Sequence, residues 1–409
     1  MLNIIWIALF VLAFGTALIK FFVFGETEIF NALMNSMFSM SKTGFEISLG
    51  LTGVLTLWLG ILKIGEQSGL VAILARALEP LFRRLAPEIP AGHPAMGAIV
   101  MNMAANALGL DNAATPIGIR AMKALQELNP DKRVATNAQI LFLVINSSGV
   151  TLFPIAILSY RAQLGAANPT DVFVPILLAT YVSTLCGLFC VAIMQKINLL
   201  DRVILLYLGG ITSAMIAIVC YFQGLDQTEM ARQSALTSNF VLFVVVISFL
   251  ILAAVRRINA YEAFIDGARE GFQTAITIIP FLIAMLVAIG VFRASGALDL
   301  LIDSIRSALT RFSLDTRFVD ALPTAFMKPL SGSGARAMMV DTMQRAGADS
   351  FAGRLACIVQ GSTETTFYVM SVYFGSVGIH NIRYALSCGL AADFAGITTA
   401  IATGYWFFG

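Results

Sequence analysis

Long apolar stretches recur along the chain and are separated by short polar segments. Nine of these stretches have about 20 residues or more, which is the length a helix needs to cross a hydrocarbon layer about 30 Å thick. We therefore predict nine membrane-spanning helices and an all-α integral membrane protein. The predicted spans are residues 2–24, 45–64, 135–160, 171–195, 203–223, 237–255, 272–292, 352–376 and 381–408.

Four segments between the spans have other patterns. Residues 70–85 and 298–312 alternate apolar and charged faces at helical period, which is typical of helices lying in the membrane interface. Residues 94–127 and 318–346 each have two apolar arms around a polar break. An arm of a dozen residues reaches only about 18 Å, so neither arm crosses alone. We predict two re-entrant hairpins with polar tips near mid-membrane, where irregular backbone survives only inside protein or beside a wet cavity.

The two halves of the chain match each other. Residues 42–70 align with 269–297 without a gap, and the same order follows in both halves: interfacial helix, hairpin, and two spanning helices. Five predicted spans separate the two copies, and an odd number inverts the second copy relative to the first. We predict two inverted repeats, residues 1–200 and 201–409, an organisation that is frequent in transporters.

The composition narrows the function. Hydrophobic residues make up 58% of the chain and charged residues 12%, about half the usual charged share, which excludes a soluble enzyme and a nucleic-acid binder. The sequence lacks GxxxxGK[ST], HExxH and GxSxG motifs, so we expect no enzymatic activity. Five cysteines without CxxC spacing and only two histidines, His93 and His380, predict neither a disulfide framework nor a metal site. We expect no resident cofactor.

The distribution of basic residues indicates an orientation. Residues 2–24 lack a basic leader and a small-residue cleavage site, which favours a retained helix over a removed signal peptide. With the N-terminus inside, 14 Lys and Arg residues lie inside and 10 outside. The positive-inside rule then predicts a cytoplasmic N-terminus in a bacterial inner membrane, surrounded by lipid.

Four polar breaks interrupt the apolar segments and converge under this arrangement. Two are the hairpin tips, residues 106–116 and 328–336, and two lie within predicted spans, residues 146–151 and 360–366. Gly and Pro there free backbone polar groups, and the resulting helix ends direct partial charges at the midplane. We predict a solute site between the breaks. The candidate substrate-binding residues are Asn106, Asn112, Thr115, Asn146, Ser148, Lys328, Ser331, Ser333, Arg336, Ser362, Glu364 and Thr365.

The polar residues at the breaks could also have purely structural roles. Ser and Thr in membrane helices usually hydrogen-bond to their own backbone, and Asn also caps helices. Lys328 and Arg336 either meet a substrate anion or neutralise Glu364. For Glu364 a functional role is the favoured interpretation, because a carboxylate inside a membrane-spanning helix is costly unless it is paired or solvated. Glu364, Asp393 and Thr151 are the candidates for coupling to Na⁺ or H⁺.

The motifs at the breaks resemble the spore maturation proteins. LGLDNAATPIGIRAMKAL and LVINSSGVTLFP in the first half resemble spore maturation protein A, and KPLSGSGARAMMVD and QGSTETTFYVMSVYFGSVGI in the second resemble protein B. The chain thus resembles a fusion of the two, within the nucleoside recognition (Gate) group that includes concentrative nucleoside transporters. The resemblance implies a concentrative-nucleoside-transporter-like fold of inverted repeats, hairpins and broken helices. It also implies a role in spore core dehydration. The nucleoside transporters' ligand motifs do not match here position by position, so nucleoside specificity is not carried over.

We expect a secondary transporter of a small polar solute, nucleoside-like or an anionic metabolite. A nucleoside, an amino acid, a dicarboxylate and a metal ion all remain open. The alternatives are a non-transporting component of spore or envelope maturation that acts through a protein partner, and a passive channel. A cavity bounded by Asn106, Asn146, Ser333 and Glu364 distinguishes a transporter from a partner-binding component. The spans 203–223 and 237–255 either form contacts between protomers in a homo-oligomer or face lipid.

Overall fold

The computed structural model describes residues 2–109, 111–149 and 151–409, with the side chains of residues 2 and 111–113 also outside the described part. Within these residues every regular element is helical, apart from one isolated bridge between Val134 and Asn381. The elements are α1 (Leu2–Phe24), α2 (Ile29–Gln67), α3 (Leu70–Leu85), α4 (Pro94–Ala107), α5 (Asp111–Leu128), α6 (Asn137–Ser148), α7 (Ile155–Gln163), α8 (Phe173–Gln195), α9 (Arg202–Gln223), α10 (Gln227–Val255), α11 (Ala260–Ala294), α12 (Ala297–Thr310), η1 (Arg317–Ala321), α13 (Leu322–Met327), α14 (Gly332–Ala346), α15 (Phe351–Gly361), α16 (Thr366–Ser376) and α17 (Ala385–Phe408).

Seven helices in the described residues are long and apolar enough to cross a membrane: α1, α2, α8, α9, α10, α11 and α17. They coincide with seven of the nine predicted spans, and the protein is a multi-pass membrane protein. The 39-residue α2 and the 35-residue α11 exceed the predicted spans 45–64 and 272–292. At 1.5 Å per residue they reach about 50–60 Å, well beyond the hydrocarbon layer. The extension of α2 has a local cause, because residues 29–43 contain no Gly or Pro and include three methionines, a good helix-forming residue.

The other two predicted spans are each divided into two short helices. Residues 135–160 form α6 and α7, and residues 352–376 form α15 and α16, with unwound backbone at both predicted polar breaks. Pro154 ends the first break, since proline lacks an N–H and disfavours helical backbone in the residue before it. The first halves of both broken helices start at side-chain caps: Thr136 accepts from the backbone N–H of Gln139, and Ser350 from that of Gly353.

Short helices also occupy the predicted interfacial segments and hairpins. The interfacial segments form α3 and α12, which begin after Gly69 (φ 80°) and Gly296 (φ 83°). Glycine suits both positions because left-handed backbone strains other residues. α4 packs against α5, and α13 against α14. The first arm of the second hairpin is less regular than predicted, since η1 and the six-residue α13 replace one helix of a dozen residues.

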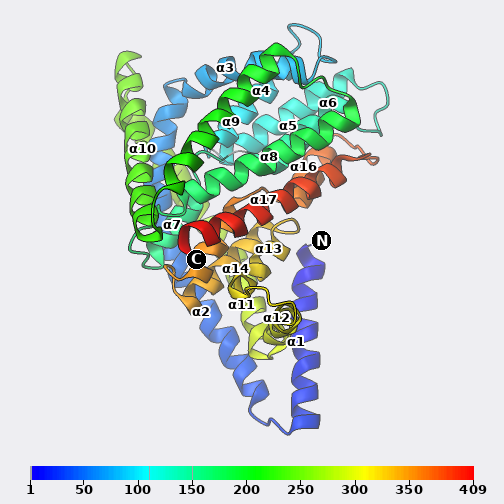
Figure 1. The fold of residues 1–409 in the computed structure, drawn as a ribbon, viewed down its shortest axis with the longest axis vertical. Helices are drawn as coiled ribbons and strands as arrows, with labels where there is room; N and C mark the ends of the chain where they lie inside the picture. Colours follow the sequence, from blue (N-terminus) through cyan, green and yellow to red (C-terminus); the bar gives the residue numbers. More distant parts are fainter. Residues whose placement is uncertain (1, 110, 150) are drawn as a thin grey trace.

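The long helices pair in a particular way. α2 runs along α11, and α8 runs along α17. The first pair approaches closely at glycines: a Cβ on Gly271 would lie 2.7 Å from the Leu55 carbonyl oxygen, and one on Gly267 would collide with the Leu59 carbonyl. In Figure 1, α1, α2, α11 and α12 form a leg below the body of the molecule. The short helices and breaks lie in that body, so the long pairs act as its frame.

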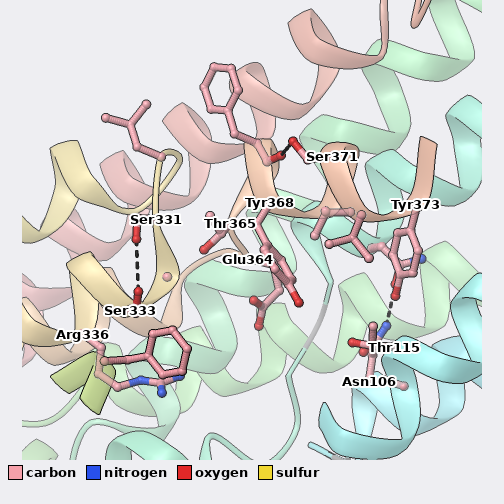
Figure 2. A pocket seen from close by; sticks show the side chains of 18 residues that line it. Asn106, Thr115, Ser331, Ser333, Arg336, Glu364, Thr365, Tyr368, Ser371 and Tyr373 are labelled. Atoms are coloured by element: carbon pink, nitrogen blue, oxygen red, sulfur yellow. Dashed lines mark hydrogen bonds between the residues drawn. The ribbon is translucent and has the colours of Figure 1, made fainter. Parts of the chain in front are cut away.

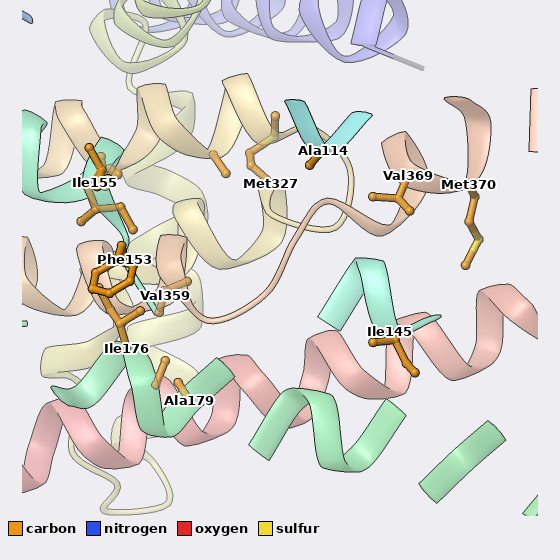
Figure 3. Close-up of a cluster of buried hydrophobic side chains, with 14 of the residues drawn as sticks. Ala114, Ile145, Phe153, Ile155, Ile176, Ala179, Met327, Val359, Val369 and Met370 are labelled. Carbon is orange, nitrogen blue, oxygen red and sulfur yellow. The ribbon is translucent and has the colours of Figure 1, made fainter. Parts of the chain in front are cut away.

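Apolar packing surrounds the two breaks. Figure 3 shows Phe153 and Ile155 from the first break beside Val359 of α15 and Ile176 of α8. The contact is tight, because a Cβ on Gly361 would lie 2.9 Å from both Ile157 and Ile176. This core fixes the positions from which polar groups of both breaks project.

The two linkers that lead into the broken helices are each held by a distant arginine. Buried Arg161, at the end of α7, donates through Nη1 to the Ala348 carbonyl in the α14–α15 linker at 2.7 Å. Arg383, after α16, donates through Nη1 to the Ala135 carbonyl in the α5–α6 linker at 3.1 Å. An arginine from each half of the chain therefore holds the linker that precedes the broken helix of the other half.

Candidate functional site

A cavity of about 660 Å³ lies where the hairpin tips and the helix breaks meet (Figure 2). α16 forms one long wall, and the start of α14, the end of α4, α5 and α6 contribute the others. The lining residues are Asn106, Ala114, Thr115, Asn146, Phe281, Leu330, Ser331, Gly332, Ser333, Arg336, Glu364, Thr365, Phe367, Tyr368, Val369, Ser371, Val372 and Tyr373.

Amide side chains line the part of the cavity built by the first half. Asn106 of α4 donates through Nδ2 to Asn146 Oδ1 of α6 at 2.7 Å and to Asn102 Oδ1 at 3.2 Å. Asn102 donates in turn to the Ala114 carbonyl of α5 at 2.7 Å, and Asn146 to the Phe142 carbonyl at 2.9 Å. This chain of amides ties both arms of the first hairpin to the first broken helix, and it leaves a polar, uncharged wall.

The second hairpin contributes hydroxyls and a guanidinium. Ser331 caps α14 by accepting from the Gly334 N–H at 3.1 Å, and its Oγ lies 3.3 Å from Ser333 Oγ. Arg336 follows on the next turn, with its guanidinium carbon 5.9 Å from the ring centroid of Tyr160, close enough for a cation–π contact.

The two breaks are bonded to one another. The Glu364 N–H donates to the Ser147 carbonyl at 2.8 Å, and Thr363 Oγ1 donates to the same carbonyl at 2.9 Å. Ser147 lies in the last turn of α6, where carbonyls have no intrahelical partner. Thr363 Oγ1 is also 2.5 Å from Oδ1 of Asp393, a buried residue of α17. These hydrogen bonds thus join α6, the second break and α17.

Each break also holds the hairpin tip of its own half. The Leu152 N–H donates to the Ala107 carbonyl at 3.0 Å, and the Phe367 N–H donates to the Pro329 carbonyl at 3.1 Å. Tips and breaks therefore form one hydrogen-bonded assembly around the cavity.

Glu364 is the exposed member of the second break. Its side chain lines the cavity, and no ion pair or hydrogen bond joins its carboxylate to another described residue. In the view of Figure 2 it stands between Arg336 on one side and Asn106 and Thr115 on the other.

A smaller cavity of about 110 Å³ adjoins the first and shares Gly332, Arg336 and Glu364 with it. Its further lining includes Thr151, buried Lys328 and buried Tyr160. Arg336 and Glu364 therefore stand at the junction of the two cavities.

The structure brings most of the predicted site residues together. Ser148 and Ser362 line neither cavity: their hydroxyls donate to their own helices, at the Val144 and Val359 carbonyls. Asp393 lies behind the second break, and the side chain of Asn112 is outside the described residues. Lys328 and Thr151 line the smaller cavity. The larger cavity contains Asn106, Thr115, Asn146, Ser331, Ser333, Arg336, Glu364 and Thr365, and their binding of a solute stays a prediction.

Sequence reasoning missed the aromatic lining. Tyr368 and Tyr373 of α16 and Phe281 of α11 border the larger cavity, and Tyr160 borders the smaller one. A signal existed for α16, because Phe367, Tyr368, Ser371 and Val372 follow i, i+1, i+4, i+5 spacing and so share one helical face. Finding it requires treating α16 as a separate half-helix that starts at the break.

Comparisons with known proteins identify the family of the chain. The profile of the Gate family, described as nucleoside recognition, matches residues 48–164 and 275–380, which is more than half of the chain. The chain belongs to the nucleoside recognition (Gate) family. All four polar breaks fall within the two Gate segments, so the family match covers the cavity that they form.

Two relatives of this Gate protein are spore maturation proteins of Bacillus subtilis (strain 168). Spore maturation protein A is 41% identical over 183 residues, covering 45% of this chain and 90% of the relative. Spore maturation protein B is 42% identical over 158 residues, covering 39% of this chain and 87% of the relative. Each relative is nearly complete within less than half of the chain, which confirms the predicted resemblance to a fused A/B protein. No solved structure matches the chain.

Proposed function

We propose that this protein is a secondary transporter that binds a small polar solute in the 660 Å³ cavity. One observation carries the proposal: all four polar breaks supply side chains to that one cavity. Asn106 comes from the first tip, Ser333 from the second, Asn146 from the first break and Glu364 from the second. Unwound backbone and a carboxylate are costly inside a membrane, and they occur there chiefly around solute and ion pathways. No catalytic role is assigned to any of these residues.

The proposed fold is a pair of inverted repeats, 1–200 and 201–409, as in concentrative nucleoside transporters. The pairing of α2 with α11 and of α8 with α17 supports it, because a two-fold relation places each long helix beside its own counterpart. The reciprocal anchoring by Arg161 and Arg383 supports it as well. In this arrangement the hairpins are re-entrant, and they move with the breaks against the long helices to expose the cavity to alternate sides.

Coupling to H⁺ or Na⁺ belongs to the same proposal. Asp393 is buried behind the second break, and its Oδ2 and the Thr366 hydroxyl have no hydrogen-bond partner among the described residues. These oxygens, with Glu364 and Thr151 at the cavities, are the groups through which a proton or cation would act. The proposed location is the bacterial inner membrane with a cytoplasmic N-terminus, where 14 basic residues then lie inside.

Solute counterflow in proteoliposomes tests this function. Metabolites that stabilise the purified protein against thermal unfolding are loaded into vesicles, and uptake of the labelled solute is followed with and without a pH or Na⁺ gradient. We expect uptake above that of empty vesicles, abolished in Glu364→Gln when driven by pH. Glu46→Gln is the matched control, because Glu46 lies on the surface of α2 with only an i,i+4 partner, Lys42. Equal uptake by vesicles with and without protein would refute transport.

The names of the relatives favour a second candidate, a non-transporting membrane component of spore or envelope maturation. Such a component would act through a protein partner, and its cavity would serve no solute. It predicts that Ser333→Leu, which narrows the cavity, leaves cellular function unchanged. The transporter predicts that the same substitution abolishes it.

A further inference from the structure

The charges at the cavity junction are opposite and unpaired. Arg336 and Glu364 line both cavities, yet no ion pair joins them to each other or to another described residue. Lys328, the third charged residue of the lining, interacts electrostatically with Asp393 behind the break. Isolated charges in a membrane interior are costly unless a partner offsets them. The junction therefore presents one cation, which contacts the Tyr160 ring, and one anion, and neither has an oppositely charged partner among the described residues.

The smaller cavity has the chemistry of a carboxylate pocket. Tyr160 is only 3% exposed, and its hydroxyl has no hydrogen-bond partner among the described residues. It lines the cavity together with Arg336 and buried Lys328. A tyrosine, an arginine and a lysine that also interacts with Asp393 border this space of about 110 Å³, which suits a group with two or three anionic oxygens. An unpartnered buried donor carries a desolvation cost that such a ligand removes.

The larger cavity has the chemistry of an amine and side-chain pocket. Glu364 projects into it as an exposed carboxylate, beside the aromatic residues Tyr368 and Tyr373. A carboxylate in a cavity with aromatic lining attracts an ammonium group and repels a second anion. The lining of this cavity also includes apolar residues such as Phe281 and Val372 and the amides Asn106 and Asn146, and so it can receive a mixed side chain.

We propose that the solute is a zwitterion of the amino-acid type. This inference rests on the proposed function and names its substrate class. The carboxylate lies in the smaller cavity against Arg336 and Tyr160, the ammonium lies against Glu364 at the junction, and the side chain extends into the larger cavity. An anionic metabolite without an amine would meet the Glu364 carboxylate, and a nucleoside would leave both charges without a partner.

Matched compound sets test the class on the full-length protein in detergent. Thermal unfolding is followed with the twenty proteinogenic amino acids, their α-carboxamides, the corresponding deaminated acids and the four common ribonucleosides. We expect stabilisation to be confined to amino acids, with the best one binding at least about tenfold more tightly than its amide and its deaminated acid, because each analogue leaves one charge unpaired.

Variants of the two charged residues test which residue binds the carboxylate of the solute and which binds its ammonium group. Arg336→Gln should remove the preference for the amino acid over its carboxamide, and Glu364→Gln the preference over its deaminated acid. Arg336→Lys and Glu364→Asp should each restore part of the lost preference. Ser376→Ala is the control that should keep both, because the Ser376 hydroxyl donates to the Tyr373 carbonyl of its own helix and the residue lines neither cavity. Ratios of affinities stay informative even where a variant is less stable.

The outcomes separate the two proposals. Binding confined to nucleosides or to deaminated acids overturns the zwitterion and leaves transport standing. Unchanged preferences in both Gln variants overturn the zwitterion as well. Failure of all four sets to stabilise the protein, together with no counterflow of any metabolite, overturns both.

Discussion

The two halves of the molecule hold the same scaffold contacts with different side-chain chemistry. In both, a backbone N–H of the break donates to a carbonyl of the hairpin tip, at Leu152–Ala107 and Phe367–Pro329. The walls nevertheless differ, because the first half lines the cavity with uncharged polar groups such as amides, and the second adds the charged residues Arg336 and Glu364. Backbone contacts place few demands on residue type, so the halves could diverge at the cavity while the frame stayed intact. The result is an asymmetric cavity, with an uncharged wall from the first half and both charges from the second.

The linker anchors show the same contrast. Arg161 is buried in a cluster with Asp171 at 2.8 Å and Asp349 at 3.0 Å, and Arg354 also bonds Asp171 at 2.8 Å. Arg383 instead donates to uncharged oxygens, at the Ala135 carbonyl and Asn137 Oδ1. One anchor is a buried ion cluster, and the other is an exposed guanidinium that donates to two uncharged oxygens, so the two linkers should respond very differently to substitution.

The largest expected effect comes from removing these anchors. Arg161→Met should lower the free energy of unfolding by about 3–5 kcal/mol, because it removes the fully buried partner of Asp171 and leaves Arg354 alone beside two carboxylates. Arg383→Met should lower it by about 1 kcal/mol per lost hydrogen bond. Thermal unfolding in detergent measures both, and equal losses would contradict the contrast between the linkers.

The stability loss of the Arg161→Met variant should depend on pH. Burial raises the pKa of Asp171, and Arg161 and Arg354 oppose that rise. Removing Arg161 raises this pKa further, so the carboxyl binds its proton at higher pH and the uncompensated charge disappears as the pH falls. We expect the stability loss of Arg161→Met to be smaller at pH 5 than at pH 8. A loss that does not depend on pH would show that the charge is not its cause.

The next largest loss of stability is expected at the contact between α2 and α11. Gly267→Leu should destabilise by about 1–3 kcal/mol, because its side chain meets the Leu59 carbonyl in the α2–α11 contact. Gly53→Leu on α2 is the matched control, since no atom lies within 4 Å of a Cβ there. Comparable unfolding temperatures for the two variants would mean that the α2–α11 contact does not hold the frame together.

At the second tip, Ser331→Ala should cost about 0.5–2 kcal/mol through loss of the α14 cap. Ser304→Ala is the comparison, because its exposed hydroxyl only bonds the Leu300 carbonyl of its own helix. The expected loss of unfolding free energy for Ser304→Ala is within about 0.5 kcal/mol. Unfolding in a denaturant series measures both losses, and equal losses would show that the Ser331 cap does not stabilise the second tip.

The smallest effect concerns the amide wall of the first half. A double-mutant cycle with Asn106→Ala and Asn146→Ala should give a coupling energy of about 0.5–1.5 kcal/mol, the net worth of one hydrogen bond. Zero coupling in unfolding measurements would show that the two amides act independently, and the first tip would then be held by its backbone bond alone.

Much of the framework could be predicted from local sequence. The length of apolar runs identified the seven long helices, and the Gly and Pro residues near Asn146 and Ser362 placed the breaks, because both signals act within a few residues. The long N-terminal part of α2 was missed, since its polar residues hide a continuous helix. At the site, Ser148 and Ser362 had the right composition and position, but their hydroxyls turn back to their own helices. No residue pattern distinguishes that rotamer from one that faces a cavity.

The sequence by itself determined that this is a multi-pass helical membrane protein with four polar breaks, and its motifs determined the family. These properties depend on hydrophobic length, helix-breaking residues and contiguous motifs, all of which are local. Only the tertiary structure decided that Tyr160 and Tyr373 join the cavity and that Arg336 and Glu364 share its junction without pairing. Those facts depend on the angles at which short helices cross and on the depth at which each tip stops, which are set by contacts between residues far apart in the chain.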